Sequence, residues 1–361
     1  MLPRFAQSAA AIGLSIILGP VISALGALRG RSKTPIVDIM NSFICRRDDK
    51  TNRFVVVEKI SEEQTIKLAE SKDLLLSLLK IEENISLLID NYKDLQNEIL
   101  RTLQQLYLTG SDSRWSGLDC LVRYNGRAAN LLASFKSYVD HIEKKYQRKY
   151  NGVIYKYYRE KASEIFDHAS GRYKFACKLR NYCQHFDLPA HGYGFTHGAT
   201  SYETKESMVS VRFYASKKEL LRSPFDWGNS TKFLEGAEEE IEITNLLSDL
   251  VFSVLGIHRH LMGKLNTLYS ESNHLYSKYF DLEKEDEYYM IVKTSSDDEK
   301  GVLPFRVHES VEYNVDKITK RLKYYKKKND ISLTLNKVSF TLQPASDVRY
   351  SDLLESSKKI T

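Results

Sequence analysis

The stretch that decides the fold runs from Ser61 to Leu108 and reads SEEQTIKLAESKDLLLSLLKIEENISLLIDNYKDLQNEILRTLQQLYL. Its apolar residues recur at alternating spacings of four and three: Leu74, Leu78, Ile81, Ile85, Leu88, Tyr92, Leu95 and Ile99. This spacing predicts one long helix with an apolar stripe, and Ser61 with Gln64 forms a capping box at its start. A coiled-coil dimer or neighbouring helices of the same chain could cover the stripe. We favour the second because only about three to four heptads are kept.

Two further helices are expected after a turn-like break at residues 110–117. The second covers residues 119–149 and has one apolar face, formed by Leu131, Leu132, Phe135, Val139, Ile142 and Tyr146. The third covers residues 153–186 and is interrupted near Gly171, because glycine weakens a helix. Residues 61–189 therefore predict an antiparallel helical bundle.

The remaining segments have a different character. Residues 190–361 predict an α+β appendage with a helix over 231–280 and strands at 208–214, 288–294, 303–307 and 331–342. Residues 191–198 are expected to form a loop, and 34–60 a linker with a short strand at 54–57. With an apolar helix at residues 1–33, the expected fold is mainly α, a helical bundle with a C-terminal α+β appendage.

The N-terminal segment from Ser8 to Leu28 has no charged residue, and it has about the 20 residues that a helix needs to cross a bilayer. Arg29, Arg31 and Lys33 follow it, so the positive-inside rule predicts a cytoplasmic protein anchored to the inner membrane. Three alternatives remain open: a cleaved signal peptide, a start codon upstream of the true one, and a soluble apolar helix, since glycines and a proline interrupt the run.

The composition is that of an ordinary folded protein. The chain has 361 residues and 53 Lys plus Arg against 47 Asp plus Glu, and the net charge of +6 is too mild to require a nucleic-acid partner. Its four cysteines (Cys45, Cys120, Cys177 and Cys183) form no CxxC pair, which argues against a structural zinc site and fits a reducing compartment. Walker A, GxGxxG, HExxH and GxSxG motifs are missing, so we expect no metal and no cofactor.

The most informative chemistry lies in residues 179–189, LRNYCQHFDLP. Pro189 disfavours helical geometry in the residue before it, so His185 should lie in the last turn of the third helix. The negative end of the helix dipole there favours a protonated imidazole. Asn181 lies one turn before His185, and Arg180 lies in the neighbouring row. This combination suits a phosphodiester, since arginine can hold phosphate oxygens in a fork while histidine moves a proton.

The string resembles the motif of the HEPN superfamily, in which an arginine, a polar residue and, three to five residues later, a histidine lie at the end of a helix in a four-helix bundle. Arg180, Asn181 and His185 match this motif one for one. The helix before it resembles the HEPN helix that commonly carries an acidic or polar residue facing the motif. Asp140 is the first candidate for that role and Glu143 the second. The resemblance covers residues 120–190.

The resemblance implies a metal-independent endoribonuclease that acts as a homodimer, cleaves RNA by attack of the 2′-hydroxyl, and leaves a cyclic phosphate and a 5′-hydroxyl. It assigns His185 as general acid or base, Arg180 as phosphate clamp and Asn181 as the residue that orients them, with Asp140 completing the catalytic set. It also implies a bacterial toxin or phage-defence (abortive-infection) effector, controlled by an antitoxin or sensor protein. The alternative is a non-catalytic helical sensor or scaffold, tethered to the membrane, that binds RNA or a partner. The motif could also be purely structural, with Arg180 paired with an acidic residue such as Asp140 and His185 capping the bundle.

Basic and aromatic residues alternate just before the motif. The candidate RNA-binding residues are Lys145, Arg148, Lys149, Tyr155, Lys156, Tyr158 and Arg159. Cations of such a surface bind phosphates and its rings stack on unpaired bases. A second basic cluster at residues 320–328 repeats the pattern. Tyrosines in a bundle are also often core residues, and with a membrane anchor either cluster could contact anionic lipid.

Overall fold

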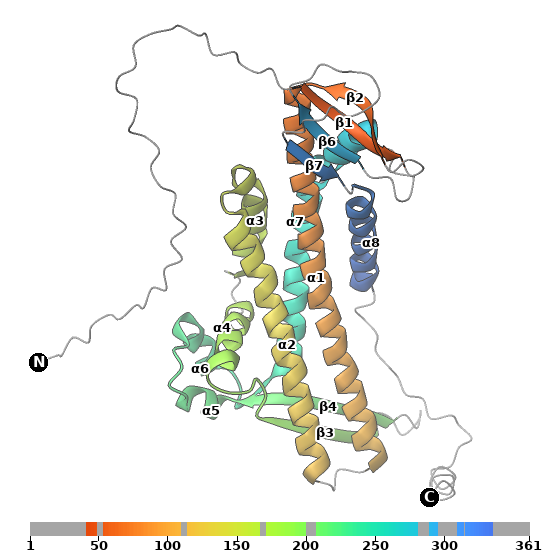
Figure 1. Cartoon of the computed structure of the whole chain (residues 1–361). Coiled ribbons are helices and arrows are strands. Elements are labelled where there is room, and N and C mark those ends of the chain that lie inside the picture. The colour runs from red at the N-terminus through yellow and green to blue at the C-terminus, as the bar shows by residue number, and fades with distance from the viewer. Residues whose placement is uncertain are drawn as a thin grey trace, which may run out of the picture. The chain divides into compact units, whose positions relative to one another are not determined.

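A computed structural model describes residues 41–48, 53–109, 114–166, 171–199, 207–280, 289–294, 309–313 and 315–334 (Figure 1). All of these fall within one compact unit. The protein is mainly helical with a small sheet part, which confirms this part of the expected fold class. The predicted apolar helix at residues 1–33 lies outside the described residues. Within the described ranges, no helix is long and apolar enough to cross a membrane.

The long helix predicted from the stripe is α1, Glu62–Thr109. The capping box at its start is formed: the Gln64 amide donates to Ser61 Oγ at 3.1 Å, and the Ser61 amide donates to Gln64 Oε1 at 2.7 Å. The stripe residues from Leu74 to Leu95 are buried, apart from the partly buried Tyr92. Helices α2 (Arg114–Tyr146), α7 (Ile243–Tyr279) and α8 (Val315–Thr334) contact α1. The stripe is therefore covered within the chain, as we favoured.

The predicted third helix is divided into α3 (Val153–Phe166) and α4 (Arg172–His185). Gly171, at the N-terminus of α4, has a φ of 64°, a left-handed conformation that glycine adopts without steric cost. The interruption predicted near this glycine is therefore confirmed.

The connection between α2 and α3 contains a short 3-10 helix, Lys149–Gly152. Tyr150 in it has a φ of 53°, an uncommon value for a residue with a bulky side chain. Its hydroxyl donates to Asp73 Oδ2 at 2.6 Å and lies 2.9 Å from Ser77 Oγ. These hydrogen bonds to α1 hold the turn in its strained conformation.

The domain boundary predicted at residue 190 does not appear. The helix expected over 231–280 is instead α6 (Thr231–Gly236), strand β5 (Glu240–Glu242) and α7. Helix α7 contacts α1, α3 and α4 (Figure 1) and contributes many residues to the same hydrophobic core. Its apolar surface is too extensive for the small sheets to cover. The segment that we expected in an appendage thus supplies a central helix of the bundle.

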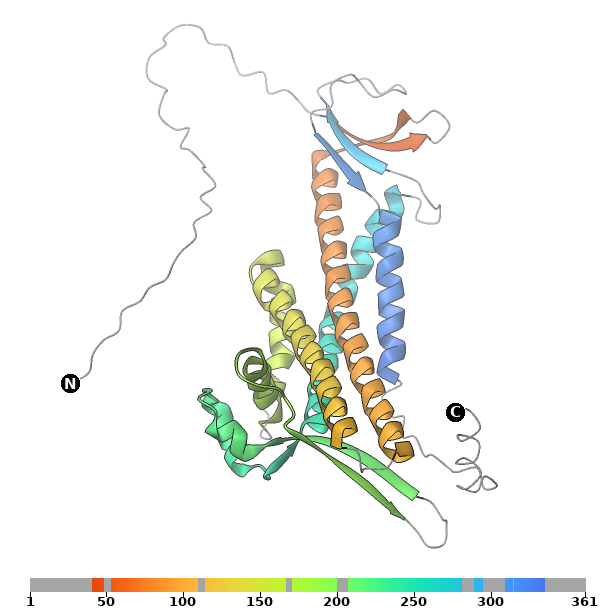
Figure 2. The same cartoon turned by 60° about the horizontal axis from the view of Figure 1, so that its bottom comes forward.

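Two antiparallel sheets flank the helices. The first has the order β2-β1-β6-β7, with β1 Asn41–Asp48, β2 Arg53–Ile60, β6 Tyr289–Thr294 and β7 Glu309–Tyr313. The second has the order β3-β4-β5, with β3 Gly192–Ala199 and β4 Ser207–Ser216, so residues 192–198 form a strand rather than the expected loop. Strand β4 contacts α1 and α7, and β3 contacts α2 (Figure 2). The predicted linker thus pairs with strands from the C-terminal half.

Helix α8 is attached to α1 by polar contacts. Arg321 contacts Glu83, and Lys328 donates to Asp90 Oδ2 at 2.7 Å. Residues 331–334 belong to this helix, so the prediction of a strand at 331–342 is wrong for its first four residues. The rest of that strand, and the strand expected at 303–307, lie outside the described residues.

A buried polar network joins α1, α2, α7 and α8. Asn329 Nδ2 donates to Glu82 Oε2 at 2.6 Å, and His258 Nε2 lies 3.5 Å from the same carboxylate oxygen. The other ring nitrogen of His258 lies 3.2 Å from the hydroxyl of Tyr138. Burial alone would raise the pKa of Glu82, but His258 and Asn329 outweigh it and leave the pKa below its ordinary value. The carboxylate is therefore held in its charged form inside the core.

Candidate functional site

Helix α4 carries the motif and ends at His185, as Pro189 led us to predict. Phe186 closes the helix, its amide donating to the Tyr182 carbonyl at 2.9 Å. Beyond the motif, Asn125 of α2 holds the backbone of Ala190 with two hydrogen bonds of 2.9 Å. The end of α4 is thus fixed against α2, and the motif residues project from a rigid support.

Arg180 lies half-buried and, among the described residues, has no acidic partner. Its Nη1 donates to Asn181 Oδ1 at 3.0 Å, whereas its Nε is buried and has no hydrogen-bond partner. In the part of the chain that the structure describes, no carboxylate forms an ion pair with this guanidinium. A partly desolvated cation without a counter-charge is costly, so Arg180 is poised to receive an anion.

Asp140 and Glu143 are engaged elsewhere. Asp140 binds Lys136 and Lys144 of its own helix, the second at 3.0 Å. Burial raises its pKa, but the two lysines outweigh burial and lower the pKa below the ordinary value. Glu143 lies 3.7 Å from the guanidinium of Arg159. No described contact therefore joins Asp140 to Arg180, and the ion pair expected for a purely structural motif is not formed.

A cavity of about 440 Å³ lies between α2, α3 and α4. Asn181, Glu143, Arg159 and Cys177 are among its lining residues, whereas Arg180 and His185 are not. Burial raises the pKa of the Cys177 thiol to about 12, so this cysteine stays protonated and is not a nucleophile. The motif thus contributes only its amide side chain to this cavity.

His185 is exposed at the end of α4 and is followed by an exposed aromatic ring. Phe186 is 48% exposed, yet its ring is parallel to Tyr182 within 3° and meets Phe225 edge-on at 5.2 Å. Two neighbouring rings therefore hold Phe186 in place. Our sequence reading missed Phe186, although the aromatic residues at 182 and 186, one turn apart, gave a signal.

Phe186 is the last member of a row of aromatic rings along α4. Phe233 stacks on Phe175 at 4.7 Å, Phe175 lies 5.3 Å from Trp227, and Trp227 lies 5.3 Å from Tyr182. Trp227 is buried, and its indole donates to the Leu220 carbonyl at 3.0 Å. We call the five rings of residues 233, 175, 227, 182 and 186 the aromatic row. It connects the two ends of α4.

The seven candidate RNA-binding residues lie in different environments. Four are exposed: Lys145, Arg148, Lys156 and Arg159. Lys149 is paired with Asp73 at 2.7 Å, and Tyr155 is partly buried. Tyr158 is only 2% exposed because it lies on the face of α3 that packs into the core, so it cannot stack on a base. The exposed part of this candidate surface is therefore smaller and more basic than the sequence predicted.

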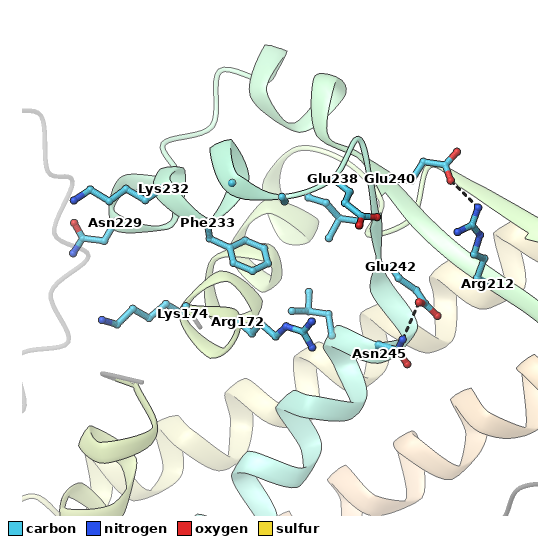
Figure 3. A pocket seen from close by; sticks show the side chains of 15 residues that line it. Arg172, Lys174, Arg212, Asn229, Lys232, Phe233, Glu238, Glu240, Glu242 and Asn245 are labelled. Atoms are coloured by element: carbon cyan, nitrogen blue, oxygen red, sulfur yellow. Dashed lines mark hydrogen bonds and ion pairs between the residues drawn. The ribbon is translucent and has the colours of Figure 1, made fainter. Parts of the chain in front are cut away.

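A larger cavity, of about 800 Å³, lies at the other end of α4 (Figure 3). The start of α4, helix α6 and strand β5 line it. Among the described residues, no cluster of three or more His, Cys, Asp or Glu side chains could hold a metal ion.

Comparison with known proteins gave no significant match to a family model, a curated protein or a solved structure. What the site can do must therefore be argued from its own geometry.

Proposed function

We propose that this protein is a metal-independent endoribonuclease of the HEPN type. Its site is formed by Arg180, Asn181 and His185 at the end of α4. The observation that carries the proposal is the half-buried Arg180, which has an unpartnered Nε and no carboxylate among the described residues. A guanidinium in this state binds a phosphate well, because two parallel N–H groups can meet two phosphate oxygens.

The reaction follows from the two side chains. His185 takes the proton from a ribose 2′-hydroxyl, or gives one to the departing 5′-oxygen. Arg180 stabilises the negative charge that develops on the phosphoryl oxygens, and its hydrogen bond to Asn181 orients the fork. The 2′-oxygen forms a bond to phosphorus as the bond to the 5′-oxygen breaks, which leaves a 2′,3′-cyclic phosphate and a 5′-hydroxyl.

A second copy of the chain completes the site in this proposal. One imidazole cannot remove the 2′-proton and protonate the 5′-oxygen at the same moment, so two motifs acting together are the simplest arrangement. Support comes from the open position of His185, which is exposed and lines neither of the two cavities described above. We therefore propose a homodimer with the two α4 ends facing each other.

The biological setting is proposed on the same basis. The resemblance of residues 120–190 to a HEPN bundle favours a bacterial toxin or abortive-infection effector with RNA as substrate and an antitoxin or sensor protein as regulator. We propose that it acts in the cytoplasm, with residues 8–28 as an anchor to the inner membrane. The exposed Lys145, Arg148, Lys156 and Arg159 would bind the RNA backbone.

A non-catalytic module that binds RNA or a protein partner is the second candidate. The observation that favours this candidate is that neither of the two described cavities is lined by Arg180 or His185. No described cavity would therefore enclose a substrate at the motif. A half-buried guanidinium and an exposed imidazole can bind an anionic partner without catalysing its cleavage.

Cleavage of RNA by the purified full chain separates the two candidates. We expect fragments with cyclic-phosphate ends, and we expect their rate of formation to fall about 100-fold or more in His185→Ala and in Arg180→Lys, since lysine cannot form the bidentate contact. His274→Ala and Arg222→Lys change exposed residues outside the motif and should cleave normally. Equal cleavage by His185→Ala and the parent chain would refute this site, and binding without cleavage by the parent chain would favour the second candidate.

A further inference from the structure

The cavity at the start of α4 is a groove between an open strand edge and a set of helices. One wall consists of β5 with the residues on either side of it, and the other consists of the first turn of α4 together with residues 229–236. In the sheet order β3-β4-β5, strand β5 is last, and within the described ranges no strand pairs with its other edge. The groove runs along this unpaired edge (Figure 3).

The register shows which backbone groups of β5 face the groove. Glu242 pairs with Tyr214, whose carbonyl accepts from the His191 amide and therefore points toward β3. In an antiparallel ladder this makes Tyr214–Glu242 a non-hydrogen-bonded pair, and such pairs alternate with hydrogen-bonded ones. The backbone groups of Glu240 and Glu242 consequently point away from β4, toward the groove. Because the Glu242 carbonyl lies at the N-cap of α7, the edge offers two N–H groups and the Glu240 carbonyl.

Apart from Arg212 of β4, which lies on the strand side and binds Glu240, the two walls carry opposite charges. Glu238, Glu240 and Glu242 lie on the strand side, and Arg172, Lys174 and Lys232 lie on the helix side, with Phe233 between them (Figure 3). Arg172 is bound to Asp249 at 2.6 Å and Glu240 to Arg212 at 3.2 Å. Among the described residues, Lys232 and Glu238 are exposed and take part in no ion pair. A ligand that carries both charges would complement this groove better than an anion or a cation alone.

We infer that the groove binds an extended peptide segment of a partner protein as an additional strand on β5. An unpaired strand edge is a template for such addition, in which main-chain hydrogen bonds give affinity and the side chains give specificity. Residues of the peptide opposite Glu240 and Glu242 would be lysine or arginine at alternate positions, because opposite charges stabilise cross-strand pairs. An acidic residue of the same segment would meet Lys232. The volume of about 800 Å³ is sufficient for such a ligand.

This inference does not depend on the proposed ribonuclease, whose residues lie at the other end of α4. Each proposal can be refuted without the other, because peptide binding is measured without RNA and RNA cleavage is measured without peptide.

The test is selection of a phage-displayed library of random dodecapeptides on the immobilised full chain. Peptides that are enriched are then synthesised and titrated by fluorescence anisotropy. We expect them to share the alternating basic pattern. We also expect Glu240→Pro to weaken their binding about tenfold or more, since proline removes an N–H that faces the groove and breaks no bond to β4. Glu240→Gln keeps that N–H and removes only the charge that would pair with a basic residue of the peptide, so it should weaken binding less than Glu240→Pro does.

A second pair of variants protects the test against misfolding of the proline variant. A Cβ at Gly236, which lines the groove, meets no atom within 4 Å, and the same holds for Gly263, which lies outside it on α7. Gly236→Phe should occlude the groove and abolish binding, whereas Gly263→Phe should leave binding intact. The inference is overturned if no peptide is enriched over a blank support, or if the enriched peptides bind Gly236→Phe as tightly as the parent chain.

Discussion

Glu82 and Arg180 are both charged and shielded from water, but they differ in their partners. Glu82 is 2% exposed and is held by Asn329 and His258. Among the described residues, the guanidinium of Arg180 donates to the side-chain oxygen of Asn181 and forms no ion pair. Removing one partner of a paired buried charge destabilises the folded state, whereas an unpaired charge is a place where an external ion gains binding energy. The first is accordingly a structural residue and the second a functional candidate.

The lowered pKa of Glu82 makes a prediction about acid stability. Its ordinary pKa is 4.5 and the folded-state value is lower, so its contribution is complete above about pH 4.5 and is lost as the pH falls through the folded pKa. Glu82→Gln should lower the free energy of unfolding at pH 7 by about 1–3 kcal/mol and lose this part of the pH dependence. Urea unfolding from pH 7 to pH 3 measures both effects. Glu62→Gln, an exposed change in the first turn of α1, should behave like the parent, and a parallel pH profile for Glu82→Gln would contradict the assignment.

Single residues were predictable where a local rule applied. Pro189 placed His185 in the last turn, and Ser61 with Gln64 marked the start of α1. The burial of Tyr158 was not predictable, because it depends on which face of α3 meets the core. The exposure of Phe186 was not predictable either, since it depends on Tyr182 and Phe225 lying where they do.

At the scale of elements, the connection between α2 and α3 is held to α1 by the pair of Lys149 with Asp73 and by the hydroxyl of Tyr150. Tyr150→Phe removes the hydrogen bonds to Asp73 and Ser77 and leaves the strained backbone in place. We expect the free energy of unfolding to fall by about 1–3 kcal/mol, because polar groups that face this turn lose a partner. Denaturant unfolding measures the change. Tyr157→Phe, a partly buried tyrosine of α3, is the matched control, and an equal effect of both substitutions would show that the hydroxyl of Tyr150 is not responsible.

The helices α1, α2, α3 and α4 were predictable because their signals are local: apolar spacing, caps and a breaking glycine. Strands β1, β3 and β7 were missed for different reasons. Strand β1 pairs with β6, which lies far along the chain. Strand β3 contains glycines, which are rare in strands, and β7 has only five residues. The break between α6 and α7 was hidden because acidic residues are also common on exposed helix faces. The acidic residues between α6 and α7 lie in β5, whose extended conformation depends on pairing with β4.

The whole molecule behaves as one core rather than as a bundle with an appendage. Helix α7 is buried against α1, α3 and α4, so residues 61–189 alone would expose the surfaces that α7 covers. We therefore predict that the fragment 61–189 shows no cooperative thermal transition by circular dichroism, whereas the full chain does. The fragment 41–334, which retains α7 and both sheets, is the control and should melt cooperatively. A cooperative transition in the shorter fragment would show that the boundary predicted at residue 190 is real.

The aromatic row gives this protein an internal optical reporter. The chain has 2 tryptophans, Trp115 in α2 and Trp227 at the middle of the row. The buried indole of Trp227 is separated by one ring from Phe233 in the groove wall. It is also separated by one ring from Phe186, the residue that follows His185. With Trp115 replaced by phenylalanine, the tryptophan emission of the folded chain would come from Trp227 alone. Events at either end of α4 would then register in one fluorescence signal without any attached dye.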